Sequence, residues 1–384
     1  MTLFRNFNRF FNKFLRQPEY ALSVGFKRLR ASFYYHFGKG RSSYPESVTF
    51  FLTHKCNLRC KMCGQWGEGG VTKKQSNQYI QEELSFKQIK PIIDDMARFK
   101  PNITLFGGEP LLYPNFLEVA KYIKEKRMHC LVITNGFLLE SFAEAIVDIG
   151  LDELNVSLDG AAALHDEIRG VPGLFDRIMS GLKKVNYYKA LKEKKRPLIN
   201  LQCTITKHNY KFLEQMLDVT KEAQAVSLTY HNLIFISKEI IDKQRKFDEL
   251  LTCSSRDWEG FIFNPKIDVD LLNEKIKEIR SQKNKFSVDF YPNFSRFALL
   301  EYYNNPDYAL KGYSSRCLSP WIAGYIFPDG ELRPCLNCSY SFGNLKEHKF
   351  MSLWNSSNAM RYRLILKKNK IFPVCIRCTE LYRY

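Results

Sequence analysis

The chain has 384 residues and a hydrophobic content of 45%, which is enough for one large domain and a smaller one. Its formal net charge of +18 favours anionic partners, such as a phosphorylated substrate, an anionic membrane surface or nucleic acid, without choosing among them. No apolar stretch approaches the roughly 20 residues of a membrane span, and no secretion signal or nucleic-acid recognition motif stands out. We therefore expect a cytoplasmic protein with no nucleic-acid partner.

Residues 1–45 differ from the rest in charge and pattern. They carry nine Lys or Arg residues and one acid, Glu19, which gives nine minus one, or +8. Apolar side chains recur three and four positions apart: Leu3, Phe4, Phe7, Phe10, Phe11, Phe14 and Leu15. A helix with this face and a cationic opposite face suits an anionic membrane surface, at the inner side of the membrane. A helix docked on its own domain and an arm that packs on a partner are the alternatives.

The first predicted strand, at residues 48–53, ends in a loop that carries Cys56, Cys60 and Cys63. Three close thiols at the end of a strand can converge on one soft metal centre. A cubane iron–sulfur cluster usually takes four thiolates, so three would leave one iron open, and an open metal position is where chemistry takes place. A zinc knuckle and three unrelated core thiols are the alternatives.

A helix at 83–99 and a strand at 102–106 follow, and the strand runs into Gly107, Gly108, Glu109 and Pro110. Two glycines at a strand end allow the backbone to approach a ligand closely. A carboxylate beside them can accept hydrogen bonds from an ammonium group. A simple turn is the alternative.

The alternation continues with helices at 116–126, 139–149, 174–191 and 210–223 and strands at 130–134, 153–158, 198–206 and 225–230. Repeated strand–helix units predict a parallel α/β sheet. Because the carboxyl ends of parallel strands form one rim, we expect Asn135, Ser157 and Asp159 beside the three thiols, although each could instead be a helix cap or an Asx-turn. Cys130 and Cys203 lie inside predicted strands and are expected in the core.

Residues 237–310 break this rhythm, with a helix at 268–282 and a short strand at 285–290. We treat them as a bridging region, in which Cys253 lies in a polar loop and is interpreted as incidental. Beyond them, residues 311–384 hold a second group of cysteines: Cys317, Cys335, Cys338, Cys375 and Cys378. Pro-Asp-Gly at 328–330 predicts a hairpin. Two CxxC pairs also allow a zinc ribbon.

The CxxxCxxC spacing, followed by Gly-Gly-Glu-Pro after one helix and one strand, resembles the radical S-adenosylmethionine (SAM) superfamily. The resemblance implies a partial (β/α)6 barrel at residues 46–236. It also implies an enzyme in which a [4Fe–4S] cluster on Cys56, Cys60 and Cys63 cleaves SAM reductively to a 5′-deoxyadenosyl radical. That radical abstracts hydrogen from a substrate, and a flavodoxin- or ferredoxin-type protein supplies the electron.

The resemblance also assigns roles in binding SAM. The run from Gly107 to Pro110 would bind the amino group, and Ser157 and Asp159 would contact the ribose. Arg169 would lie by the SAM carboxylate, which suits a bidentate guanidinium, with a surface salt bridge as the alternative. Met62, where the family often has an aromatic residue, would contact adenine through its backbone.

The C-terminal cysteines resemble the cluster domain called SPASM and its shorter relative, twitch. A full SPASM domain has three more cysteines after the late CxxC, and this sequence has none there. We therefore expect the twitch form, with one auxiliary [4Fe–4S] cluster on Cys317, Cys335, Cys375 and Cys378. Cys338 would be spare, although in a zinc ribbon it would be a ligand. Full ligation by four cysteines suggests electron transfer or a structural role.

The sequence leaves the substrate open. A peptide, a sugar or small alcohol, and a lipid-linked molecule are the classes we consider. The short N-terminal segment leaves little room for a peptide-recognition module. Leu336 stands where sulfatase-maturing relatives carry an acid, which argues against that reaction. A non-catalytic scaffold that binds zinc or an iron–sulfur cluster is the alternative function.

Overall fold

The structure is a computed structural model that describes residues 18–305, 307, 313 and 316–383. The amphipathic helix predicted at 3–15 lies outside the described residues. Among the described helices, none combines the length and the apolar character needed to cross a membrane.

A single ten-stranded sheet forms the core, with the strand order β10-β9-β8-β1-β2-β3-β4-β5-β6-β7. Neighbouring strands from β8 to β7 are all parallel, and β9 and β10 add an antiparallel edge. The strands are β1 (Ser47–Phe51), β2 (Asn102–Phe106), β3 (Cys130–Thr134), β4 (Glu153–Ser157), β5 (Leu198–Ile205), β6 (Ser227–Asn232), β7 (Ser287–Tyr291), β8 (Ala323–Ile326), β9 (Glu331–Arg333) and β10 (Gly343–Asn344). The predicted six-strand parallel barrel is confirmed, and β7 and β8 extend it.

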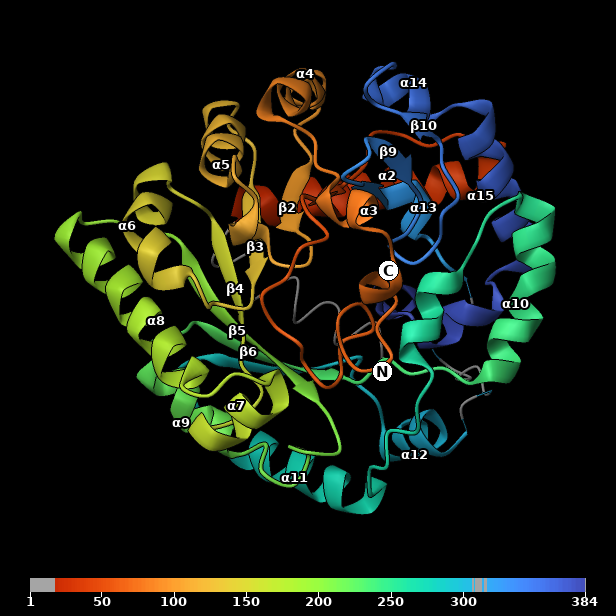
Figure 1. The fold of residues 1–384 in the computed structure, drawn as a ribbon. Coiled ribbons are helices and arrows are strands. Elements are labelled where there is room, and N and C mark those ends of the chain that lie inside the picture. Colours follow the sequence, from red (N-terminus) through yellow and green to blue (C-terminus); the bar gives the residue numbers. More distant parts are fainter. Residues whose placement is uncertain (1–17, 306, 308–312, 314–315, 384) are drawn as a thin grey trace.

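Helices cover the outer face of this sheet, as Figure 1 shows for α4, α5, α6 and α8. Their bounds are α2 (Pro18–Phe37), α3 (Asn77–Gln81), α4 (Phe86–Met96), α5 (Phe116–Glu125), α6 (Leu139–Ile149), α7 (Ala162–Arg169), α8 (Leu174–Leu191), α9 (Gln215–Glu222), α10 (Lys238–Leu251), α11 (Val269–Ser281), α12 (Arg296–Asn304), α13 (Ser319–Ile322), α14 (Phe350–Trp354) and α15 (Ser357–Asn369). Helices α6 and α8 have the predicted limits. Helix α4 begins later than predicted because Ser85 and Gln88 form a capping box there.

The C-terminal segment is joined to the barrel through the sheet itself. Strand β8 pairs with β1, and the predicted hairpin at 328–330 connects β8 to β9. Phe51 of β1 stacks on Phe327 with ring centroids 5.4 Å apart, so β1 is covered on both faces. Because one sheet runs through both parts, the limits assigned to the two domains stay a prediction.

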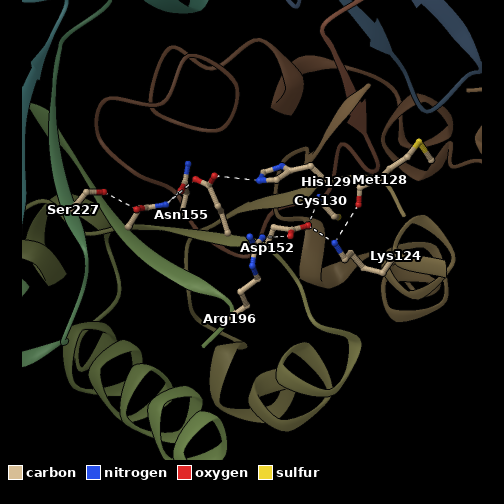
Figure 2. Close-up of polar contacts among 10 residues, drawn as sticks. Lys124, Met128, His129, Cys130, Asp152, Asn155, Arg196 and Ser227 are labelled. Atoms are coloured by element: carbon tan, nitrogen blue, oxygen red, sulfur yellow. Dashed lines mark hydrogen bonds and ion pairs between the residues drawn. The ribbon is translucent and has the colours of Figure 1, made fainter. Parts of the chain in front are cut away.

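A chain of polar contacts ties together the amino ends of the strands (Figure 2). Asp152 precedes β4 and accepts hydrogen bonds from Lys124, from Arg196 and from the backbone N–H of Cys130. Ser227, at the start of β6, donates to Asn200 of β5. These contacts hold the floor of the barrel, and the opposite rim is the one that carries the loops with the predicted site residues.

Helix α2 is docked on the same molecule. Tyr35 packs against Trp321 with ring centroids 4.9 Å apart, and Arg28 forms an ion pair with Glu46 at 2.8 Å. Ala31 lies in the same contact and is 2% exposed. The docked face therefore holds α2 against the C-terminal segment through Tyr35 and against Glu46 through Arg28.

Candidate functional site

The loop after β1 lies within the arc of the sheet, where Figure 1 shows it in orange. Each of its three thiols accepts a hydrogen bond from nitrogen. The backbone N–H of Leu58 donates to Cys56 Sγ at 3.5 Å, and that of Trp66 donates to Cys63 Sγ at 3.3 Å. The Arg169 guanidinium donates to Cys60 Sγ at 3.7 Å. Hydrogen bonds to sulfur stabilise thiolates and tune the potential of iron–sulfur clusters, so the loop has the donors that such a cluster needs.

Burial raises the pKa of the Cys56 thiol to about 12. Cys56 is therefore a thiol at neutral pH in the metal-free protein. Since the metal ligand is the thiolate, binding of a cluster releases this proton.

The residues that follow β2 form backbone hydrogen bonds with the start of the cysteine loop. The backbone N–H of Gly108 donates to Thr53 O at 2.8 Å, and that of Glu109 donates to Lys55 O at 2.8 Å. A Cβ on Gly108 would lie 2.2 Å from Lys55 O, and a Cβ on Gly107 would lie 2.6 Å from Thr53 O. Only glycine permits this approach, so the two glycines hold the cysteine loop in place.

Glu109 is the buried carboxylate of the site, with an exposure of 1%. It accepts hydrogen bonds from Thr134 Oγ1 at 2.6 Å, from the backbone N–H of Asn135 at 2.7 Å and from that of Leu111 at 3.1 Å. Burial nevertheless raises its pKa to about 7. A cation such as an ammonium group would stabilise the ionised form of this buried carboxylate.

Asn135 links the thiols to Glu109. Its side-chain amide donates to Asn57 Oδ1 at 2.9 Å and approaches Cys56 Sγ at 3.9 Å, while its backbone binds Glu109. The side-chain oxygen accepts the N–H of Phe137 at 2.9 Å, which fixes the amide orientation. The predicted meeting of Asn135 with the cysteine loop is therefore observed.

Arg169 and Asp159 form a buried pair. Arg169 Nε donates to Asp159 Oδ2 at 2.6 Å, and the other carboxylate oxygen accepts the N–H of Thr204 at 2.7 Å. Asp159 is 0% exposed. The alternative of a surface salt bridge is wrong, because the pair is buried and Arg169 also reaches Cys60. Asp159 positions Arg169 in this structure, and its contact with ribose stays a prediction that requires the pair to rearrange.

The remaining predicted residues lie at the same rim. Ser157 ends β4 and is partly exposed, Met62 lies between two of the cysteines, and Pro110 begins a short 3-10 helix of residues Pro110–Leu112. Their contacts with SAM stay predictions.

Four further residues of the site, His54, Trp66, Tyr79 and Thr134, belong to no motif that the sequence analysis singled out. The backbone oxygen of His54 accepts a hydrogen bond from Trp66 Nε1 at 2.8 Å, and the His54 ring stacks on Tyr79 at 4.2 Å. Burial lowers the pKa of His54 to about 4, so its ring is neutral at pH 7. Thr134, as the last residue of β3, could have been singled out by the rule that strand ends bear ligand contacts.

The C-terminal cysteines form a second group of thiols. Cys317 has Cys375 and Cys378 as electrostatic neighbours, and Cys335 has Cys338, Cys375 and Cys378. The four expected cluster ligands and Cys338 are thus brought together. Cys253, which was interpreted as incidental, lies beside this group, with its Sγ 3.7 Å from Cys338 Sγ.

Within the described ranges, no three His, Cys, Asp or Glu side chains converge on a point as the ligands of one metal ion would. The thiolates of a four-iron cluster bind different irons and need not converge in this way. The two groups of thiols, with N–H donors to Cys56, Cys60 and Cys63, fit iron–sulfur clusters by the chemistry of their donors.

Comparison with protein families gives two matches along the chain. The model described as the radical SAM superfamily matches residues 50–189. The model described as an iron–sulfur cluster-binding domain, SPASM, matches residues 317–379. The first match contains Cys56, Cys60, Cys63 and Glu109, and the second contains all five C-terminal cysteines.

Curated relatives match most of the chain. The Fe-coproporphyrin III synthase of Methanosarcina barkeri is 25% identical over 327 residues, which cover 80% of this chain and 73% of that protein. The AdoMet-dependent heme synthase of the same organism is 26% identical over 323 residues, covering 83% and 84%. A crystal structure of Streptococcus suis SuiB superposes with a TM-score of 0.61 at 17% identity, covering 89% of this chain and 74% of that one. The last similarity shows that the fold is shared.

Proposed function

The chain belongs to the radical SAM superfamily and carries a SPASM-type iron–sulfur domain, and from this premise we propose that it abstracts hydrogen from an anionic small molecule. A [4Fe–4S] cluster on Cys56, Cys60 and Cys63 supplies, when bound, the electron that cleaves SAM to the 5′-deoxyadenosyl radical. The observation that carries the proposal is that polar side chains contact two of these thiols: Asn135 joins Cys56 to Glu109, and Arg169 contacts Cys60.

The residues around these thiols have separate roles in binding SAM. Glu109 accepts hydrogen bonds from the ammonium group, and Asn135 holds Glu109 beside Cys56. Arg169 offers its remaining N–H groups to the SAM carboxylate, while Asp159 fixes the guanidinium. A flavodoxin- or ferredoxin-type protein delivers the electron.

The relatives indicate one further substrate class, namely tetrapyrroles. Two relatives that match at least 80% of this chain are a Fe-coproporphyrin III synthase and a heme synthase. The net charge of +18 suits a substrate with several carboxylates. We therefore place a tetrapyrrole carboxylate ahead of a peptide, a sugar alcohol or a lipid-linked molecule.

Turnover with Fe-coproporphyrin III tests the substrate class. In reduced, cluster-loaded enzyme, this compound is expected to raise the rate of 5′-deoxyadenosine formation above the rate with SAM alone, and to change its own mass. A peptide substrate serves as the comparison. If the tetrapyrrole leaves both quantities unchanged while another compound raises the rate, the substrate class is wrong and the radical chemistry stands.

An anionic membrane surface is the proposed location of this reaction. One face of α2 exposes large apolar side chains, each more than half exposed: Leu22, Phe26, Leu29, Phe33 and Phe37. Beside this stripe, Lys27, Arg30 and Arg98 line a hollow of about 250 Å³. Apolar side chains next to a cationic hollow suit lipid tails and phosphate headgroups, respectively.

The triple variant Leu29→Ser, Phe33→Ser and Phe37→Ser tests this location. It is expected to weaken binding to vesicles of phosphatidylglycerol by more than about tenfold, because each side chain contributes roughly 1.5–3 kcal/mol when fully buried. Phe297→Ser on α12 is the matched control, since Phe297 is 65% exposed elsewhere on the surface. Equal vesicle binding by the triple variant and the control would rule out the stripe as a membrane contact.

A further inference from the structure

The assignment of four cysteines to the auxiliary cluster gives no ligand role to two neighbouring thiols, Cys253 and Cys338. A four-iron cluster takes one thiolate at each iron, and the four expected ligands already supply them. Cys253 Sγ nevertheless lies 3.7 Å from Cys338 Sγ, although 85 positions separate the two residues in the chain. The fold therefore brings together two thiols that the cluster does not need.

A tight turn at the end of α10 sets the position of Cys253. Thr252, the residue before it, closes the helix in a left-handed conformation with φ of 54°. The backbone N–H of Cys253 donates to Asp248 O at 2.9 Å. Ser255 donates to the Asp248 carboxylate through both its N–H and its hydroxyl, each at 2.8 Å. Hydrogen bonds on both sides of Cys253 thus fix this turn to the helix.

The turn is also fixed to the loop that carries Cys338. The N–H of Ser339 donates to Ser254 O at 2.8 Å, and the N–H of Ser254 donates to Ser339 Oγ at 2.7 Å. Arg361 of α15 donates to Leu250 O at 2.6 Å, near the end of α10. These contacts hold the two loops together without any bond between the sulfur atoms, so the thiols stay close in the reduced protein.

The two thiols differ in their access to solvent. Cys253 is partly exposed, whereas Cys338 is buried with an exposure of 6%. A small reagent can therefore reach Cys253 first, and Cys338 is placed to react with the product. Cys335 also contacts Cys338. Once a cluster holds Cys335 as a ligand, Cys253 is the partner that remains for Cys338.

We propose that Cys253 and Cys338 form a reversible disulfide when the protein meets an oxidised low-molecular-weight thiol, such as glutathione disulfide. The Cys253 thiolate attacks one sulfur of the reagent, a glutathione thiolate leaves, and a mixed disulfide remains on Cys253. Cys338 then loses its proton to water and attacks Cys253 Sγ, which releases the second glutathione. The two protein thiols lose two electrons and two protons, and the reagent gains them as it becomes two thiols.

The structure requires only a local change for this step. A disulfide has a sulfur–sulfur distance of about 2.05 Å, so the two atoms must approach by roughly 1.7 Å from the observed 3.7 Å. The closed bond would join the end of α10 covalently to the loop after β9. Because disulfides of cytosolic proteins are usually transient and sense the redox state, we expect the open form under reducing conditions. The inference rests on the proposed cluster ligands, and on neither the substrate nor SAM cleavage.

Peptide mapping tests the disulfide in the unmutated, cluster-loaded protein. The protein is incubated anaerobically with glutathione disulfide, its free thiols are blocked with iodoacetamide, and it is digested without reductant. Mass spectrometry is expected to show a peptide pair linked through Cys253 and Cys338, which dithiothreitol separates, while the iron content stays unchanged. Absence of this pair would overturn the proposal, and so would a link between Cys338 and Cys335 that forms with loss of iron.

Single variants test the order of the two steps. In Cys338→Ala, glutathione is expected to accumulate on Cys253, because the thiol that displaces it is absent. In Cys253→Ala, the buried Cys338 is expected to stay reduced. Cys130→Ala, which removes a core thiol outside both groups, should form the linked pair as the unmutated protein does. Equal amounts of glutathione on Cys253 in the unmutated protein and in Cys338→Ala would overturn the proposal, whatever the enzyme does with SAM.

Discussion

Replacing Cys60 by alanine is expected to abolish reductive cleavage of SAM, down to the level of the iron-free protein. Cys60 is one of only three thiols in its loop, and no other described thiol accepts a hydrogen bond from Arg169. Two remaining thiolates cannot hold a four-iron cluster that normally takes four. The variant should bind about four irons fewer than the unmutated protein, and it should form no 5′-deoxyadenosine.

The fold should survive this change, which makes the result interpretable. Arg169 keeps its ion pair with Asp159 when the thiol is removed, so no buried charge loses its only partner. Cys130→Ala is the matched control, because it also removes a buried thiol and lies in β3 outside both cysteine groups. The assignment would be contradicted if Cys60→Ala kept its iron and still cleaved SAM at the rate of the control.

Replacing Glu109 by glutamine is expected to weaken SAM binding by roughly 10- to 100-fold in Kd. A hydrogen bond to a charged group contributes about 1.5–3 kcal/mol, and the glutamine amide lacks the charge that an ammonium group requires. The three donors that hold the Glu109 carboxylate would also face an NH₂ group on one side. Isothermal titration with SAM on the cluster-loaded protein measures the effect, with Glu125→Gln, an exposed residue of α5, as the control.

The pH dependence of SAM binding tests the same residue. Burial raises the pKa of Glu109 to about 7, so the carboxylate is protonated below that pH and ionised above it. SAM affinity should therefore rise from pH 6 to about pH 7.5, and it should fall again as an α-amino group loses its proton near pH 8. In Glu109→Gln the rise on the acid side should be absent. An unchanged rise in that variant would assign the titration to another group.

The core of the fold follows closely from the sequence pattern. The apolar runs at 102–106 and 130–134 are alternately buried strands, and the helices α6 and α8 begin and end where the periodicity predicts. The bridging region was harder to predict. Helix α12 is rich in aromatic residues and has no clear apolar stripe, and α10 was not predicted although Ile240, Ile241 and Leu251 form a buried face. Pairing between β1 and β8 also escaped prediction, since it joins residues nearly 280 positions apart and leaves no local signal.

In the candidate site, too, the sequence predicted some residues and missed others. Cysteine spacing and Gly-Gly-Glu-Pro were sufficient to locate the thiols, the glycines and Glu109, because their chemistry requires those residue types at that spacing. The partner of Arg169 was not predicted, since Asp159 looked like one more polar residue at a strand end. The contact of Cys253 with Cys338 was not predicted because it spans 85 positions, between two loops that the sequence does not relate.

The most direct test is to measure iron, sulfide and zinc in anaerobically reconstituted protein, together with SAM cleavage after dithionite reduction of the same sample. Two iron–sulfur centres predict about eight irons per chain, matching sulfide, and formation of 5′-deoxyadenosine. Zinc without sulfide, and no cleavage of SAM, would contradict the account and indicate a metal-binding scaffold with this fold.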